Sequence, residues 1–352
     1  MRAVTGRILT LLPTAALACA LCLVPLPNAR AGAVGLKTPN LADLGTTKAF
    51  RTSTLAPSAQ ARLTAAGFWG GPTTASTGEA VTVFVSNTYP QDPTTQKRWA
   101  DFFASLLHGS ELSLLNAYLM PLSEVQSYCG QSALACYSPR NSTLVAPGDN
   151  PGLDVSAEAV VAHEYGHHVA EHRDNQPWDA IDYGTKRWAS YVQVCARTTS
   201  GELHPGAETQ SDYATNPGEA FAETYRVLNE RRLGVAETAW NIVTNSLYPD
   251  DAALARVEQD VTQPWTGDTT GTYRGTSGKR YSITTSLDGP LTVKVTAAKR
   301  TRVRLQVGSS STTTTAGGSR TVTRTVCGQR TQQVRVTRMS GKGGYALSVA
   351  KP

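Results

Sequence analysis

The sequence predicts an α+β domain, built from a small sheet and several helices, followed by a separate all-β sandwich. In the first part of the chain helical and strand-like periodicities alternate, whereas the C-terminal part is strand-like throughout, with Thr, Ser and Gly between the strands. Charge changes at the same place. Residues 32–269 have 15 basic and 26 acidic residues, but residues 270–352 have 15 basic residues and one acid, Asp288. We therefore expect domains at 76–266 and 270–352.

The first 31 residues have the features of a secretory signal peptide. Arg2 and Arg7 form a basic start, an apolar run follows from Ile8 to Leu26, and Ala29-Arg30-Ala31 offers a cleavage site with small residues. No other stretch is long and apolar enough to span a bilayer. We therefore expect an exported protein, secreted or periplasmic, with no transmembrane segment after signal cleavage.

Residues 32–75 are rich in Ala, Thr, Gly and Pro and have weak periodicity. They are expected to form a leader, a linker or a removable pro-segment. In the domain that follows, periodicity predicts strands and helices. The expected strands are 80–85, 113–120 and 143–145, and the expected helices are 94–108, 155–173, 178–195, 217–231, 236–247 and 250–261.

Residues 163–167 read His-Glu-Tyr-Gly-His, inside the helix expected at 155–173. Residues four apart share one helix face, so His163 and His167 can direct two imidazoles at one point, as a zinc ion requires. Glu164 lies beside them, where a general base is needed. The alternative is a solvated polar face. For His168 and His172 we expect either such a face or a supporting contact behind the ligands.

A catalytic zinc needs a third protein ligand and an open position. Arg173 stands where a metzincin has its third histidine, and the spacing of Asp179 and Asp182 does not fit an aspzincin. The best candidate is Glu219, three residues after Asn216, although a glutamate there also suits a capping box. Glu223, one turn later, is expected to hydrogen-bond a ligand imidazole, with a direct ligand role as the alternative.

The motif H-E-x-G-H, followed by a tyrosine and a helix with E-x-F-A-E, resembles the gluzincin branch of zinc metallopeptidases. It is similar in particular to the protease domain of anthrax lethal factor, over residues 155–231. The resemblance implies a zincin-like fold with one Zn²⁺ bound by His163, His167 and Glu219. It also implies hydrolysis of a protein or peptide substrate by a zinc-bound water, with Glu164 as general base and Tyr213 stabilising the tetrahedral intermediate.

Four cysteines remain after the predicted signal: Cys129, Cys136, Cys195 and Cys327. An even number in an exported chain predicts disulfide bonds. Cys129 and Cys136 enclose a short loop and are the expected first pair. Cys195–Cys327 then follows by elimination.

The predicted sandwich at 270–352 resembles bacterial pre-peptidase C-terminal domains at Leu287-Asp288-Gly289 and at Gly343–Val349. Its net charge of +14 predicts attraction to an anionic cell-surface polymer. The alternative is that it docks on the acidic first domain. Nucleic acid is not the expected partner, because the strands lack interleaved aromatic residues for base stacking.

Two functions fit these observations. The first is a secreted zinc endopeptidase with a basic accessory domain. The second is a secreted protein that binds anionic surfaces and has an inactive or structural zincin core. Glu164 favours the first function, because a structural zinc site needs no base and is usually closed by four protein ligands.

Overall fold

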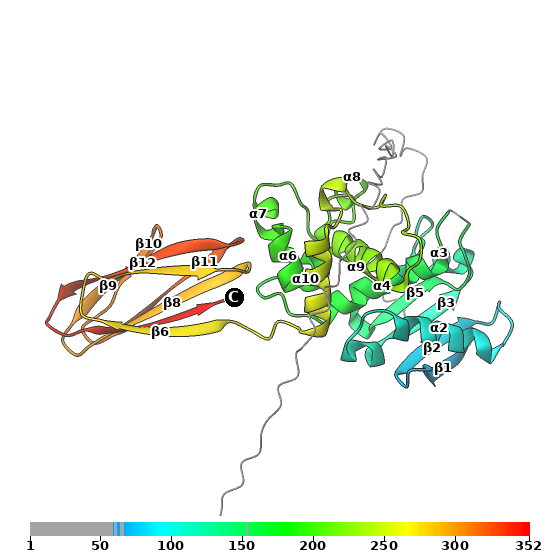
Figure 1. Cartoon of the computed structure of the whole chain (residues 1–352), viewed down its shortest axis with the longest axis horizontal. Coiled ribbons are helices and arrows are strands. Elements are labelled where there is room, and N and C mark those ends of the chain that lie inside the picture. The colour runs from blue at the N-terminus through cyan, green and yellow to red at the C-terminus, as the bar shows by residue number, and fades with distance from the viewer. Residues whose placement is uncertain (1–58, 60–61, 64–66, 153) are drawn as a thin grey trace, which may run out of the picture. The chain divides into compact units, whose positions relative to one another are not determined.

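The computed structural model describes residues 59, 62–63, 67–152 and 154–352 (Figure 1). The predicted signal peptide and most of the predicted leader lie outside the described residues. Within the described part of the chain, no helix has both the length and the apolar character that crossing a bilayer requires.

The first part of the chain contains a mixed five-stranded sheet, in the order β1-β2-β3-β5-β4. β2, β3 and β5 are parallel, and β1 and β4 add to the two edges antiparallel. The strands are β1 (Phe68–Thr74), β2 (Ala80–Ser86), β3 (Asn116–Met120), β4 (Cys136–Ser138) and β5 (Thr143–Pro147). β1 lies in the segment expected to be a leader. The sequence did not predict this strand, because Gly70, Gly71 and Pro72 interrupt the alternation of apolar and polar residues that marks a strand.

Nine α-helices are present among the described residues of this part. They are α2 (Pro93–Ser105), α3 (Leu122–Cys129), α4 (Ala157–Glu171), α5 (Ala180–Tyr183), α6 (Lys186–Tyr191), α7 (Val194–Thr199), α8 (Gln210–Tyr213), α9 (Pro217–Leu233) and α10 (Asp251–Thr262). Short 3₁₀ helices lie at Ser110–Leu114, Pro139–Asn141 and Asn245–Leu247. The mixed α/β architecture confirms the predicted fold class for this part of the chain.

Two expected helices differ from the structure. The helix expected at 178–195 is divided into α5, α6 and α7, and Gly184, with φ of 75°, separates the first two. The prediction of a helix at 236–247 is wrong, since only a 3₁₀ helix forms there, at Asn245–Leu247. The carboxylate of Glu230 accepts hydrogen bonds from both the backbone N–H and the hydroxyl of Thr238, which holds this segment in a non-helical path.

The helices α4 and α9 cross at Gly166. A Cβ atom at this position would lie 2.8 Å from Cα of Ala222 and 3.2 Å from Cβ of Tyr225. Only glycine fits at this separation, because a side chain would push the two helices apart. This contact sets the distance between the helix of the His-Glu-Tyr-Gly-His motif and the helix with Glu219.

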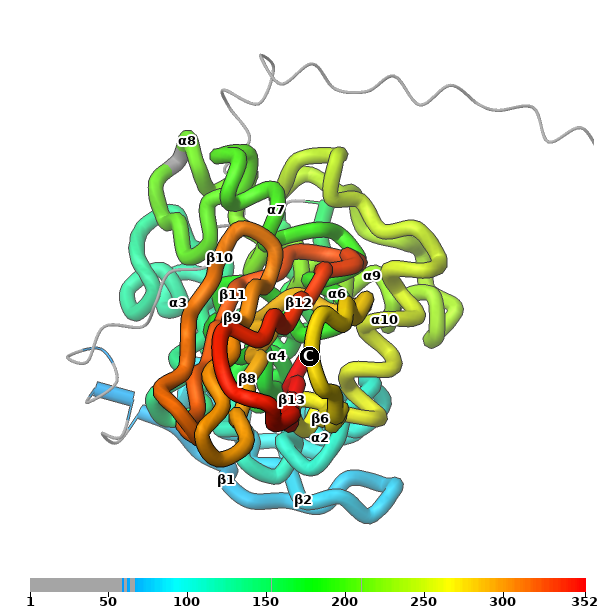
Figure 2. Tube along the Cα trace, turned by 90° about the vertical axis from the view of Figure 1, so that its left-hand side faces the viewer, coloured from blue at the N-terminus to red at the C-terminus, as the bar shows by residue number. Residues whose placement is uncertain are grey.

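The C-terminal part is all-antiparallel, as predicted, and consists of two four-stranded sheets in the orders β10-β9-β12-β7 and β11-β8-β13-β6. Its course from yellow at β6 to red at β13 can be followed in Figures 1 and 2. Alternate Val and Leu side chains of the two sheets form a core of their own. The strands are β6 (Thr269–Gly275), β7 (Arg280–Thr285), β8 (Gly289–Ala297), β9 (Arg302–Val307), β10 (Ser310–Thr313), β11 (Ser319–Val326), β12 (Arg330–Ser340) and β13 (Tyr345–Lys351).

The described residues contain two disulfide bonds, Cys129–Cys136 and Cys195–Cys327. The second joins α7 to the segment between β11 and β12. Asp288 lies beside it: its carboxylate accepts hydrogen bonds from the backbone N–H groups of Cys195 and Gly328. The one acidic residue of the C-terminal part is thus buried and is used in a local structural contact.

Candidate metal centre

The side chains of His163, His167 and Glu219 converge in the first part of the chain. One ligand atom from each residue lies within 4.8 Å of the ligand atoms of the other two, and all three side chains are buried. Nε2 of His163 is 3.2 Å, and Nε2 of His167 is 3.5 Å, from the same oxygen of Glu219. The three residues could hold one metal ion.

Local sequence explains how each helix presents its ligands. The hydroxyl of Ser156 accepts a hydrogen bond from the N–H of Ala159 and caps the start of α4. His163 and His167 then lie one turn apart near the middle of this helix. Asn216 caps α9 through the N–H of Gly218, and Pro217 occupies the first turn. Glu219 is therefore in the first turn of α9. Its carboxylate faces the imidazoles and Tyr213, so the capping-box alternative does not describe it.

The hydroxyl of Tyr213 donates a hydrogen bond of 2.7 Å to Oε2 of Glu219, the oxygen that also faces both imidazoles. Three polar groups therefore surround one carboxylate oxygen. Burial opposes ionisation of Glu219, but the attraction of His167 and His163 outweighs it and holds the pKa of Glu219 well below its ordinary value. Glu219 is thus an anion at neutral pH.

Glu223 lies behind His163. Its Oε1 is 2.8 Å from Nδ1 of His163, on the ring edge opposite to the Nε2 that faces Glu219. Burial would lower the pKa of His163, but its hydrogen bonds to Glu219 and Glu223 outweigh this effect and raise the pKa to about 10. A metal ion at Nε2 would replace a proton there, while Nδ1–H would continue to donate to Glu223.

Sequence reasoning did not identify Arg226, which holds Glu223 from the other side. Its Nε and Nη2 donate to the two oxygens of Glu223, at 2.9 and 2.6 Å, and its Nη1 donates to Glu230 at 2.6 Å. All three residues are buried. Burial raises the pKa of Glu223, but Arg226 outweighs it and lowers that pKa to about 2. The signal in the sequence was the i, i+3 and i+4 spacing of opposite charges on one helix.

Glu164 is fully buried and follows His163 directly in α4. Among the described residues, its Oε2 has no hydrogen-bond partner. Burial, reinforced by the charge of Glu219, raises the pKa of Glu164 to about 8. A buried carboxyl oxygen without a partner costs free energy, and such groups are retained mostly where a ligand or a reaction uses them.

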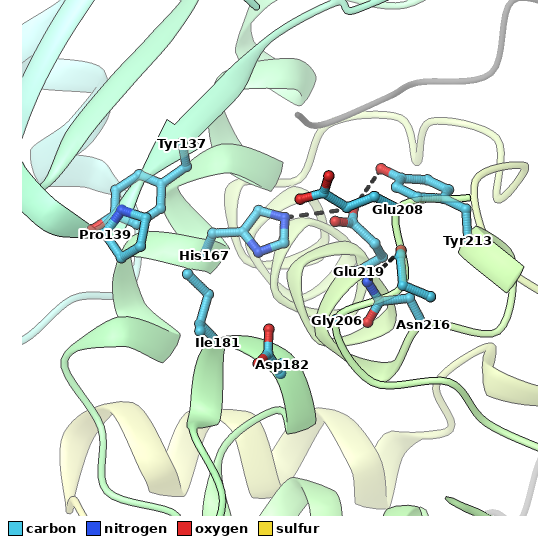
Figure 3. A pocket seen from close by; sticks show the side chains of 11 residues that line it. Tyr137, Pro139, His167, Ile181, Asp182, Gly206, Glu208, Tyr213, Asn216 and Glu219 are labelled. Atoms are coloured by element: carbon cyan, nitrogen blue, oxygen red, sulfur yellow. Dashed lines mark hydrogen bonds and ion pairs between the residues drawn. The ribbon is translucent and has the colours of Figure 1, made fainter. Parts of the chain in front are cut away.

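A cavity of about 150 Å³ opens beside the triad (Figure 3). Its lining includes His167, Glu219 and Tyr213, and also Tyr137 and Pro139 at the end of the edge strand β4. The cavity gives the triad an open side that can admit a small ligand or part of a chain.

The other candidate residues have different positions. Arg173 is bound to Glu111 at 2.8 Å and serves the fold. Asp182 lines the cavity but is not part of the triad.

His168 does not lie on a solvated face, which was one of the two expectations for it. It is fully buried, with Nδ1 3.0 Å from the hydroxyl of Tyr137 and Nε2 2.8 Å from the carbonyl oxygen of Glu111. Burial lowers the pKa of His168 to about 4. Neutral His168 therefore connects α4 to the edge strand and to the segment after α2.

The donor set fits zinc. Two imidazoles and one carboxylate, with one open side, form the three-ligand pattern of catalytic zinc sites. In the part of the chain that the structure describes, the converging group consists of these three side chains, and two of them line the cavity. A structural zinc site, by contrast, would be closed by four protein ligands.

No protein-family model matches the chain, and no curated protein matches it. Among solved structures, a de novo designed double-stranded beta-helix aligns at 13% identity with a TM-score of 0.19, over 24% of this chain and 99% of that one. A family two carbohydrate esterase from Cellvibrio japonicus aligns at 12% identity with a TM-score of 0.15, over 24% and 34% of the two chains. Similarities this weak support no inference about function.

Proposed function

We propose that this protein is an exported zinc-dependent endopeptidase, in which His163, His167 and Glu219 bind the metal and Glu164 is the general base. The observation that carries the proposal is the carboxyl group of Glu164, buried next to the metal-binding triad with one oxygen unpartnered. A purely structural site gives no reason to keep this group there. A hydrolytic site needs a proton acceptor in this position.

Zinc, when bound, would supply a Lewis acid that polarises a peptide carbonyl and acidifies water. The protein's own residues would do the remaining work. A cation at the adjacent triad would favour the ionised form of Glu164, which would then accept a proton from the attacking water and return it to the leaving amine. Tyr213 donates its hydroxyl proton to Glu219 at the edge of the cavity, and it would have to redirect this hydrogen bond to the carbonyl oxygen in order to stabilise negative charge there. Glu223 would fix the orientation of His163.

Two observations support export and an extended substrate. The two disulfide bonds suit an oxidising compartment. β4 is an edge strand in the described sheet, and the residues at its end line the cavity, so an extended peptide could align with it there.

The test combines metal analysis with a quenched fluorescent peptide library, using the full chain and its Glu164→Gln variant. We expect one zinc per chain in both proteins and hydrolysis by the wild type only, with a loss of at least about 100-fold in the variant. Chelation should abolish the activity and added zinc should restore it.

Two outcomes would contradict the proposal. If the wild type loaded with zinc cleaves no peptide in the library, the protein is not an endopeptidase. If Glu164→Gln cleaves as fast as the wild type, Glu164 is not the base, and the observation that carries the proposal has another cause.

A further inference from the structure

Four arginines share the outward face of the sheet β10-β9-β12-β7. In β9, Val303, Leu305 and Val307 are buried and the residues between them are exposed. In β12, Val334 and Val336 are buried and alternate with exposed residues in the same way. We call the outward group the arginine face, which consists of Arg280, Arg302, Arg304 and Arg335.

Strand register brings these arginines together. Arg335 of β12 is directly opposite Arg280 of β7 and, on its other side, opposite Gln306 of β9. Arg304 lies two residues before Gln306 on β9, so it is the diagonal neighbour of Arg335. β9 and β12 are labelled side by side in Figure 2. Like charges directly opposite each other destabilise a sheet unless a counter-charge is present.

The residues that the structure describes do not supply that counter-charge. Asp288 is the one acid in residues 270–352, and it is buried among backbone N–H groups. Among the described residues, no ion pair includes a basic side chain from this part of the chain. Arg304 donates only to the hydroxyl of Ser311, and Arg302 to a backbone carbonyl.

The neighbours of the arginines on this face are uncharged hydrogen-bonding groups. They are Ser282, Gln306, Ser311, Gln333 and Thr337. No aromatic side chain occupies an outward position of β7, β9, β10 or β12 in the described structure. Such a surface can pair with anionic groups and bind hydroxyls, but it offers no ring on which a nucleic-acid base could stack.

We propose that the arginine face binds an extended acidic polysaccharide, with the guanidinium groups on its carboxylate or sulfate groups and the Ser, Thr and Gln side chains on its hydroxyls. Guanidinium groups bind such anions with two parallel hydrogen bonds, which a lysine cannot do. A sheet places side chains of one face about 5 Å apart across strands and about 7 Å along them, so an extended chain can contact several arginines together. This binding is independent of the proposed peptidase activity.

The opposite sheet supplies a matched control. Its outward face is dominated by hydroxyl pairs such as Thr292–Thr323 and Thr296–Ser319, with Lys294 and Arg274 as the exposed basic residues. Arg280→Gln/Arg335→Gln and Arg274→Gln/Lys294→Gln each remove two positive charges from an exposed face. The two double variants therefore have the same net charge and differ only in where the charge was removed.

The experiment measures binding of the full chain and both double variants to immobilised heparin and polygalacturonate, with neutral dextran as the blank and a single-stranded oligonucleotide as competitor. We expect the wild type to bind both acidic polymers and to be released by salt. Arg280→Gln/Arg335→Gln should bind at least about tenfold more weakly, and the control within about twofold of the wild type. Thermal unfolding without polymer should show that Arg280→Gln/Arg335→Gln is at least as stable as the wild type, because it removes a like-charge pair.

Four outcomes would overturn the inference. In the first, the wild type retains neither acidic polymer above the dextran blank. In the second, both double variants bind equally weakly, which would mean that only net charge matters. Tighter binding to the oligonucleotide than to both polysaccharides, lost in the same variant, would assign the face to nucleic acid. An unfolded Arg280→Gln/Arg335→Gln would mean that the paired arginines stabilise the sheet, against the premise.

Discussion

Nδ1 of His163 lies 2.8 Å from Oε1 of Glu223, while Nε2 of the same ring faces Glu219. The two carboxylates thus contact opposite edges of one imidazole. Because Nε and Nη2 of Arg226 both donate to Glu223, a chain of buried charges along α9 fixes the orientation of His163. This relationship leads to the first prediction.

Glu223→Gln should weaken zinc binding by about 10- to 100-fold, since the amide keeps the shape but removes the charge behind the ligand. Titration with a competing zinc chelator would measure this. Glu158→Gln, which removes a half-exposed carboxylate in the first turn of α4, away from the triad, is the control and should leave the affinity unchanged. Equal affinity of Glu223→Gln and wild type would show that Glu223 does not support the ligand.

Arg226→Met should destabilise the protein by about 3–5 kcal/mol, because Glu223 and Glu230 would be left buried without their counter-charge. Urea unfolding of the metal-free protein would give the value. Arg232→Met, at the exposed end of the same helix, is the matched change and should cost less than about 1 kcal/mol. Similar losses in the two variants would remove the special role of Arg226.

Glu219→Ala should lose the zinc, whereas Asp182→Ala should keep it. Glu219 belongs to the converging triad, while Asp182 only lines the adjacent cavity. Metal content after dialysis distinguishes the two variants. The reverse result would assign the third ligand to Asp182 and change the proposed class of zinc site.

Gly166→Ala should disturb the crossing of α4 and α9, since the added methyl would lie 2.8 Å from Cα of Ala222. We expect a loss of about 1–3 kcal/mol in stability together with weaker zinc binding, because the ligands come from both helices. Urea unfolding and zinc titration would test this. Gly130 is exposed and has nothing within 4 Å, but its φ of 111° would strain an alanine, so Gly130→Ala is not a suitable control. Gly166→Ser serves instead as a second variant and should destabilise the protein at least as much as Gly166→Ala.

His168 should make stability depend on pH. Its pKa is lowered by burial to about 4 from an ordinary 6.5, so the unfolded chain binds the proton more readily. The stabilisation is complete above pH 6.5 and is lost as the pH falls toward 4, by roughly 3 kcal/mol over that window. His168→Gln should show a shallower fall in unfolding free energy between pH 7 and 4.5. Identical pH profiles for variant and wild type would contradict this assignment.

Sequence was informative where geometry is local. The spacing of His163 and His167 within one helix, and of Glu219 after its Asn216 cap, depends only on helical repeat and capping. The alternation of buried and exposed residues likewise predicted two β layers after residue 270.

Sequence was uninformative where distant contacts decide. β1 contains two glycines and a proline and is a strand only because β2 pairs with it. The segment at Thr238 is not helical because Thr238 hydrogen-bonds to Glu230. His168 is buried because Tyr137 and Glu111, from other elements, pack against it and hydrogen-bond to its ring. None of these partners is within one helical turn, so no local pattern could reveal them.

With Asp288 withdrawn from solvent and no histidine in residues 270–352, the exposed ionisable groups of that part are arginines, lysines and tyrosines. None of these titrates between about pH 5 and 9 at its ordinary pKa. The C-terminal part therefore behaves as a fixed positive charge, comparable to a strong anion exchanger. Its hold on an anionic matrix would respond to the ionic strength of the surroundings and remain the same in acidic and alkaline ones.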